Sequence, residues 1–117
     1  MKLVTTYALG RIAFGAATLV APAATGRLLA GDGGALPDAQ AFLRGMGGRE
    51  LGVGLGLLRA QRTASPVRPW LVAGVLSDAG DLAGFAGAWR SLPAGKRVPG
   101  AASIVTAAAA GVFLLAR

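Results

Sequence analysis

One stretch of the chain reads Trp70-Leu-Val-Ala-Gly-Val-Leu-Ser-Asp78-Ala-Gly-Asp81-Leu-Ala-Gly-Phe-Ala-Gly-Ala-Trp89. Its two tryptophans lie 19 positions apart, which is roughly 28 Å of α-helix at about 1.5 Å per residue. The hydrocarbon core of a bilayer is about 30 Å thick, and tryptophan is typical of both of its interfaces. The stretch therefore predicts a transmembrane helix with Asp78 and Asp81 near the membrane midplane.

Three further apolar stretches flank this one, and the prolines lie between the stretches rather than inside them. A proline inside a helix removes a backbone hydrogen bond, so prolines between segments mark helix ends. We expect transmembrane spans at about residues 3–20, 39–60, 70–90 and 100–116. The chain is thus predicted to be all-α, with a single transmembrane domain over residues 1–117 that folds as an integral membrane four-helix bundle.

The composition agrees with a membrane location. Of the 117 residues, 54% are hydrophobic and 15% are charged, and the mean hydropathy is +0.58, which is outside the range of typical soluble domains. The formal net charge of +7 is also compatible with nucleic-acid binding. However, the basic residues outside the apolar stretches lie at segment ends, where cations meet lipid headgroups. The predicted partner is the lipid bilayer and not nucleic acid.

The basic residues also indicate an orientation. With four spans, both termini and the central connection share one side of the membrane, which then carries Lys2, Arg59, Arg62, Arg68 and Arg117. The opposite side carries Arg27, Arg90, Lys96 and Arg97. Five basic residues against four favour a multi-pass protein of the inner (plasma) membrane with both termini in the cytoplasm.

The N-terminal stretch admits a second interpretation. Lys2, the apolar run and Ala21-Pro22-Ala23 also resemble a signal peptide with a small-residue cleavage site. Arg11 lies in the middle of this run, where a signal peptide is uncharged. We therefore expect this segment to remain uncleaved as the first transmembrane helix.

The chain contains no Cys and no His. This excludes disulfides, thiol nucleophiles, thiolate or imidazole metal ligands and a serine triad that uses histidine. Proton chemistry would have to use carboxylates, helped by arginine, Tyr7 or water. No metal and no cofactor is predicted.

Six charged residues lie inside the predicted spans, and their charges sum to zero. An unpaired charge in hydrocarbon costs about 3 kcal/mol or more, so we expect them to pair in a polar centre within the first three spans. The candidate catalytic groups or proton carriers are Glu50, Asp78 and Asp81, and the candidate charge partners or anion clamps are Arg11, Arg44 and Arg49. Such an arrangement suits an acid/base pair and equally suits a structural network, and the sequence leaves the pairing open.

The second predicted span has glycine at every fourth position, Gly48, Gly52 and Gly56. This glycine zipper removes side chains from one helix face and lets another helix approach closely. We expect a Gly52→Leu substitution to push a packed helix outward. The alternative is that the glycines open room for a ligand beside the charges.

The run Arg44-Gly-x-Gly-x-Arg49-Glu50-Leu51, followed by Asp78-x-x-Asp81, resembles small four-span membrane proteins of unknown function from high-GC bacteria. These proteins are loosely similar to the DoxX-like family. The resemblance implies a four-helix membrane bundle but brings no agreed activity, so it assigns no catalytic residue. DoxX itself is associated with redox partner complexes, and the absence of cysteine argues against a thiol role here.

Two functions remain open at this stage. The first is a membrane protein whose Arg/Glu/Asp centre binds a small lipophilic or anionic ligand, with or without acid/base chemistry on it. The second is a non-catalytic accessory or assembly subunit, in which the charges lock the bundle and the glycines dock a membrane protein partner or a second copy. An ion conductor is disfavoured because four short helices enclose little pore.

Overall fold

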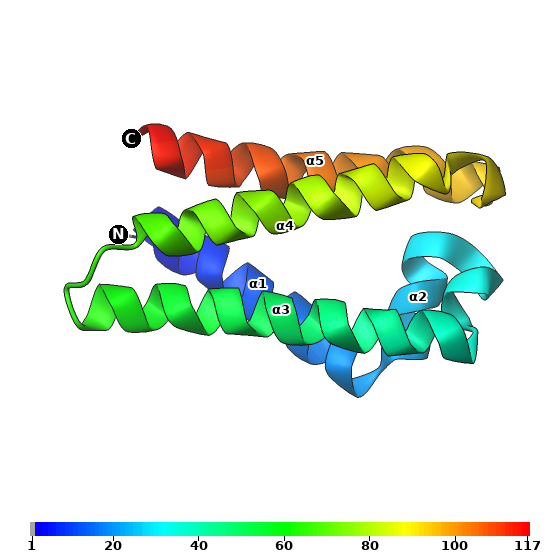
Figure 1. Ribbon diagram of the computed structural model, residues 1–117, viewed down its shortest axis with the longest axis horizontal. Helices are drawn as coiled ribbons and strands as arrows, with labels where there is room; N and C mark the ends of the chain where they lie inside the picture. The colour runs from blue at the N-terminus through cyan, green and yellow to red at the C-terminus, as the bar shows by residue number, and fades with distance from the viewer. Residues whose placement is uncertain (1) are drawn as a thin grey trace.

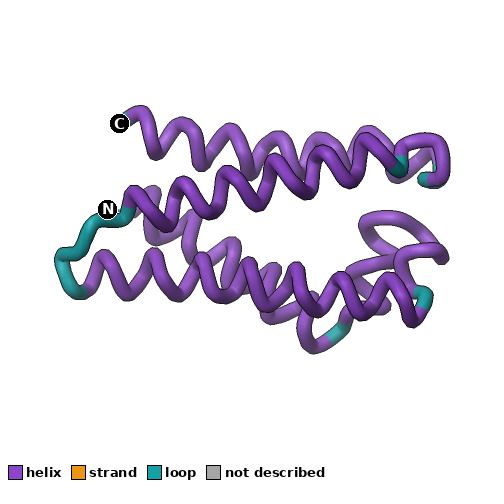
Figure 2. Tube along the Cα trace, in the orientation of Figure 1, coloured by secondary structure: helices purple, strands orange, loops and turns teal. Residues whose placement is uncertain are grey.

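The computed structural model describes residues 2–117, and the prediction of an all-α fold is confirmed. Its elements in chain order are α1 (Lys2–Val20), α2 (Pro22–Ala30), the 3-10 helix η1 (Gly31–Ala35), α3 (Pro37–Arg62), α4 (Arg68–Gly87), the 3-10 helix η2 (Trp89–Ser91) and α5 (Ala94–Ala116). Helices account for nearly all of the trace, and the longest loop joins α3 to α4 (Figure 2). The four long helices correspond to the four predicted spans, but α4 ends at Gly87, so Trp89 lies in η2 and not in the same α-helix as Trp70.

The helix boundaries differ from the prediction at two further places. Residues 22–35, which lie between the first two predicted spans, form α2 and η1. Helix α2 can begin at Pro22, because a residue in the first turn of a helix needs no backbone N–H donor. Helix α5 begins at Ala94 and includes Pro99, so the expectation that no proline lies inside a helix is wrong there.

The four long helices run roughly along one axis (Figure 1). Helix α4 lies beside α5, whereas α1 crosses behind α3, and α2 folds back over one end. Both termini and the α3–α4 loop lie at the opposite end. The molecule measures 43 × 26 × 18 Å, with its long axis parallel to the helices.

Glycines bring α1 and α3 into backbone contact. A Cβ atom added to Gly15 would lie 2.6 Å from the carbonyl oxygen of Gly47, and one added to Gly54 would lie 2.6 Å from a side-chain carbon of Ile12. These distances exclude any side chain, so each of these positions must be glycine for the helices to approach this closely.

The prediction that the glycine zipper packs against another helix of the chain is wrong at two of its three positions. A Cβ atom on Gly48 or Gly52 would meet no atom within 4 Å among the residues described, so neither glycine is needed for packing there. Only Gly56 packs, against the indole ring of Trp70. The rotation of α3 about its axis explains this difference, because the face that contacts α1 carries Gly47 and Gly54 instead.

Burial follows an unusual pattern. The apolar core is small and consists of Ala8, Val53, Leu57, Leu71 and Leu114. Large hydrophobic side chains such as Phe42, Leu76 and Phe113 are exposed, whereas Arg11, Glu50 and Asp78 are buried. The outer surface is thus largely apolar and the centre is charged.

Within residues 2–117, two helices are long and apolar enough to cross a membrane, α1 and α5. Only 22% and 17% of the residues in their most apolar windows are buried. Helices α3 and α4 are long enough, with 26 and 20 residues, but they are not among the helices apolar enough to cross a membrane, and they carry the charged residues Arg44, Arg49, Glu50, Asp78 and Asp81.

Candidate functional site

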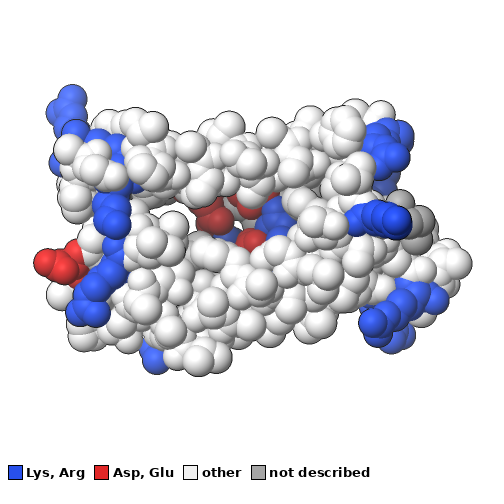
Figure 3. Space-filling model, turned by 180° about the vertical axis from the view of Figure 1, so that it is seen from behind, with Lys and Arg blue, Asp and Glu red and all other residues white. Residues whose placement is uncertain are grey.

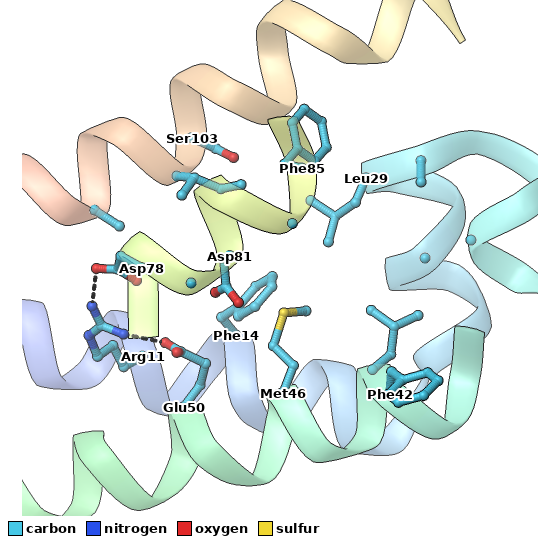
Figure 4. Close-up of a pocket in the computed structure, with 18 of the residues that line it drawn as sticks. Arg11, Phe14, Leu29, Phe42, Met46, Glu50, Asp78, Asp81, Phe85 and Ser103 are labelled. Atoms are coloured by element: carbon cyan, nitrogen blue, oxygen red, sulfur yellow. Dashed lines mark hydrogen bonds and ion pairs between the residues drawn. The ribbon is translucent and has the colours of Figure 1, made fainter. Parts of the chain in front are cut away.

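Arg11 is the centre of a buried ion-pair network. It extends from the middle of α1 and is only 5% exposed. Its Nη1 donates to Oε2 of Glu50 at 2.6 Å, and its Nη2 donates to Oδ2 of Asp78 (Figure 4). Nη2 also lies 2.6 Å from the Tyr7 hydroxyl and 3.3 Å from the Gly74 carbonyl oxygen. One guanidinium therefore joins α1, α3 and α4.

The helices that surround Arg11 are shaped to hold it. Tyr7 lies one turn earlier on α1, and the Arg11 guanidinium carbon is 4.7 Å from the centre of its ring, within cation–π range. A Cβ atom on Gly74 would lie 2.8 Å from the Tyr7 hydroxyl and 3.2 Å from the guanidinium carbon. Glycine at position 74 therefore makes the room in which the network forms.

A second ion pair joins α3 to α4 at the rim. Arg49 Nη2 lies 2.8 and 2.7 Å from the two carboxylate oxygens of Asp81, and 3.5 Å from Oε1 of Glu50. The side chains of Arg49 and Asp81 are 37% and 24% exposed, in contrast to the buried Arg11 network. Glu50 contacts both arginines and so connects the two pairs.

Arg44 lies outside this cluster. Its side chain is exposed, and it forms no ion pair or hydrogen bond with the residues that the structure describes. The cluster therefore holds three carboxylates and two guanidiniums, so its formal charge is −1 and not the zero expected from the sequence.

A cavity of about 660 Å³ opens beside the cluster. Its polar end contains Tyr7, Arg11, Glu50, Asp78 and Asp81, and its apolar wall includes Phe14, Leu29, Phe42, Leu43, Met46, Phe85 and Ile104. Figure 4 shows Glu50, Met46 and Phe42 following one another along α3 from the charges towards α2. In Figure 3 charged side chains lie at the bottom of a hollow near the centre of the face, and they are surrounded by uncharged side chains.

Helix α2 and η1 close the far end of this cavity. Gly26 and Gly34 bring their two backbones into contact and also line the cavity, together with Leu29. The sequence analysis missed the apolar wall and this closure. The wall residues lie in apolar stretches that contain nothing to distinguish a cavity from a packed core, and Gly26 and Gly34 lie outside the four predicted spans.

The acidic groups are close enough to share one cation. Each of Glu50, Asp78 and Asp81 offers an oxygen, and these oxygens lie within 4.8 Å of one another. Oxygen ligands suit hard cations such as Mg²⁺ or Ca²⁺. Two guanidiniums already donate to these carboxylates, however, so a divalent ion would raise the formal charge of the cluster from −1 to +1. The same carboxylates could exchange a proton with a molecule held in the cavity.

No family model, curated protein or solved structure matches this chain. The resemblance to DoxX-like proteins therefore stays a prediction, and the site must be interpreted from its own geometry.

Proposed function

We propose that this chain is a multi-pass membrane protein that binds a small lipophilic molecule within the bilayer. The observation that carries the proposal is the 660 Å³ cavity, which is apolar along its wall and ends on Glu50, Asp78 and Asp81. Its volume lies within the range of about 300–1,000 Å³ typical of small-molecule sites. Such sites are mostly apolar and use a few polar groups to orient the ligand.

The burial pattern supports the membrane location. In water, exposing Phe42, Leu76 and Phe113 while burying Arg11 would be unfavourable in both respects. In a bilayer the same arrangement is favourable, because charged residues of membrane helices face the bundle interior. This also explains how α3 and α4 could span lipid despite their charges.

The dimensions agree as well. The long axis of 43 Å compares with about 40–45 Å for a bilayer with its headgroup regions. On the face shown in Figure 3, Lys and Arg side chains gather at both ends, and the charged side chains near the centre lie in the hollow. Both termini lie at the end with five basic residues, which favours a cytoplasmic location for them.

An anionic ligand is disfavoured. Nη1 and Nη2 of Arg11 already donate to Glu50 and Asp78, and Nη2 of Arg49 donates to Asp81. An anion would add negative charge to a cluster whose formal charge is already −1. Of the ligands expected from the sequence, we therefore retain the lipophilic class.

An accessory or assembly subunit is the second candidate. Gly45, Gly48 and Gly52 lie on α3 where an added Cβ atom would meet no described atom within 4 Å. A strip of helix surface without side chains is typical of helix–helix contacts in membranes. This face is available to a partner or a second copy, whereas the cavity is on another side of α3.

One pair of matched substitutions separates these candidates. Gly84 lines the cavity and Gly52 does not, and at both positions an added Cβ atom meets no described atom within 4 Å. Protein purified in mild detergent would be analysed by native mass spectrometry for co-purified lipophilic molecules. We expect the parent and Gly52→Leu to retain such a molecule and Gly84→Leu to lose it. If Gly84→Leu retains it, or if only Gly52→Leu changes the bound mass, the cavity is not the binding site.

A further inference from the structure

We propose that the cavity selects a lipophilic monocation, namely a protonated amine on an apolar body, whose ammonium group lies among Glu50, Asp78 and Asp81. This inference rests on the proposed function, because it assigns the ligand class of the same cavity. Three observations carry it: the charge of the cluster, an open acceptor in it and the shape of the cavity.

A ligand with one positive charge would neutralise the cluster. Three carboxylates face two guanidiniums, and Arg44 is directed elsewhere. Among the residues that line the cavity, Arg11 is the only cation, and Arg49 lies at its rim. An uncompensated charge inside a bilayer is unfavourable. A monocation makes the cluster neutral, whereas a divalent metal would leave it at +1 and an anion would take it to −2.

The open acceptor belongs to Asp78. This residue is 4% exposed and lines the cavity, and only its Oδ2 is engaged by Arg11. Its Oδ1 accepts no hydrogen bond from any residue within 2–117. Because this oxygen is not engaged within the described residues, it can accept a hydrogen bond from a donor held in the cavity.

An ammonium group fits this geometry. It has up to three N–H donors, and the three carboxylates offer oxygens within 4.8 Å of one another. One bound nitrogen placed among these oxygens can therefore donate to all three carboxylates.

The shape of the cavity argues against a bare inorganic cation. Most of its wall is apolar and includes Phe14, Met46 and Phe85, which offer no ligand to a hydrated ion. A small ion would occupy only the charged end of a 660 Å³ cavity. An apolar body attached to the cation fills the remainder and gains the free energy of apolar contact.

The main alternative is a proton. If one carboxylate holds a proton, the cluster is already neutral, and the cavity would then have no preference for a cationic ligand. The two cases differ in how they treat ligands that share a body and differ only in charge.

The test uses three probes with the same apolar body, 4-phenylbutylamine, 4-phenylbutanol and 4-phenylbutanoate. Binding to the protein in lipid nanodiscs would be measured by equilibrium dialysis at neutral pH, with binding to empty nanodiscs subtracted. We expect the amine to bind about ten-fold more tightly than the alcohol, because an ion pair in low dielectric contributes more than a neutral hydrogen bond. We expect the acid to bind more weakly than both. This comparison uses the parent protein and needs no variant.

Variants then locate the amine. Asp78→Asn should reduce amine binding about ten-fold and bring it level with alcohol binding, which itself changes little. If Asp78→Asn does not fold, Asp81→Asn serves the same purpose, because Asp81 lies at the more exposed rim. Gly52→Leu, outside the cavity, is the matched control for both and should bind the amine as the parent does.

The outcomes distinguish the two levels of the proposal. If the amine and the alcohol bind equally and Gly84→Leu abolishes both, the cavity binds lipophilic molecules but the preference for a cation is wrong. If Mg²⁺ or Ca²⁺ alone displaces the amine at equal concentration, the acidic groups form a metal site and the preference for an organic cation is wrong. If no probe binds above empty nanodiscs, or if Gly84→Leu binds all three as the parent does, the proposed function itself fails.

Discussion

Helix α3 has two interfaces that are built in opposite ways. Towards α1 it presents Gly47 and Gly54, and the two backbones touch. Towards α4 it presents Arg49, and the two helices are joined through the ion pair of this side chain with Asp81. The first interface leaves no room for a side chain, and the second lies beside a cavity of about 660 Å³.

The contrast shows how one helix can be both a packing surface and the wall of a site. Close backbone contact with α1 sets Arg11 beside Glu50, so the rigid interface positions the charges. The reach of a guanidinium then determines how near α4 comes, because Arg11 must contact Asp78 and Arg49 must contact Asp81. Four predictions test this division, from the largest expected effect to the smallest.

Removing Arg11 should have the largest effect, because this residue belongs to both interfaces. Arg11→Gln leaves Glu50 and Asp78 as buried carboxylates without their main partner. We expect a loss of about 3–5 kcal/mol in the free energy of unfolding, which is typical when one partner of a buried ion pair is removed. The measurement is thermal or denaturant unfolding in detergent. The double variant Arg11→Gln with Asp78→Asn should recover part of the loss, and a single variant as stable as the parent would contradict the buried network.

Bulk at the α1–α3 contact should have the next largest effect. A Cβ atom at Gly15 lies 2.6 Å from backbone atoms of Gly47 and Leu51, which cannot move aside as a flexible side chain would. Gly15→Val should therefore cost about 1–3 kcal/mol or more and broaden the elution profile in size-exclusion chromatography. Gly10→Val, on the same helix with no described atom within 4 Å of its Cβ, is the control. Equal behaviour of the two variants would show that α1 and α3 are not in backbone contact.

Breaking the rim pair should cost less. Arg49 and Asp81 are 37% and 24% exposed, so their interaction is partly screened, and we expect Arg49→Gln to lower stability by about 1 kcal/mol or less. The same variant changes the formal charge of the cluster from −1 to −2. The affinity for a cationic probe should therefore increase, while the free energy of unfolding hardly changes. Stability and probe binding would be measured on the same preparation. A loss of stability as large as that of Arg11→Gln would contradict a rim pair that is more exposed than the Arg11 network.

A substitution on the free face of α3 should have the smallest effect. Nothing described lies within 4 Å of a Cβ atom at Gly52, so Gly52→Leu should change stability by about 0.5 kcal/mol or less. This reverses the expectation from the sequence, which made Gly52 part of the packing face. Unfolding and size-exclusion chromatography would be compared with the parent. A large loss of stability, or dissociation of an oligomer, would mean that another helix covers this face.

The sequence by itself determined the helical architecture. Four apolar stretches separated by prolines predicted four long helices, and the depth of Asp78 and Asp81 within their stretch predicted that arginines would have to pair with them. These features are encoded locally, because hydropathy, helix length and the cost of an unpaired charge depend on neighbours along the chain. The structure agrees: Asp78 contacts Arg11, and Asp81 contacts Arg49.

Only the tertiary structure decided which residues meet. Consecutive positions on an α-helix point about 100° apart, so the rotation of α3 about its axis decides whether Gly47 or Gly48 faces α1. The same rotation directs Arg44 outward while Glu50 faces Arg11. It also sets the charge of the cluster at −1 and leaves the cavity open between α3 and α4. Rotation depends on all neighbouring helices at once, which is why no local pattern in the sequence contains it.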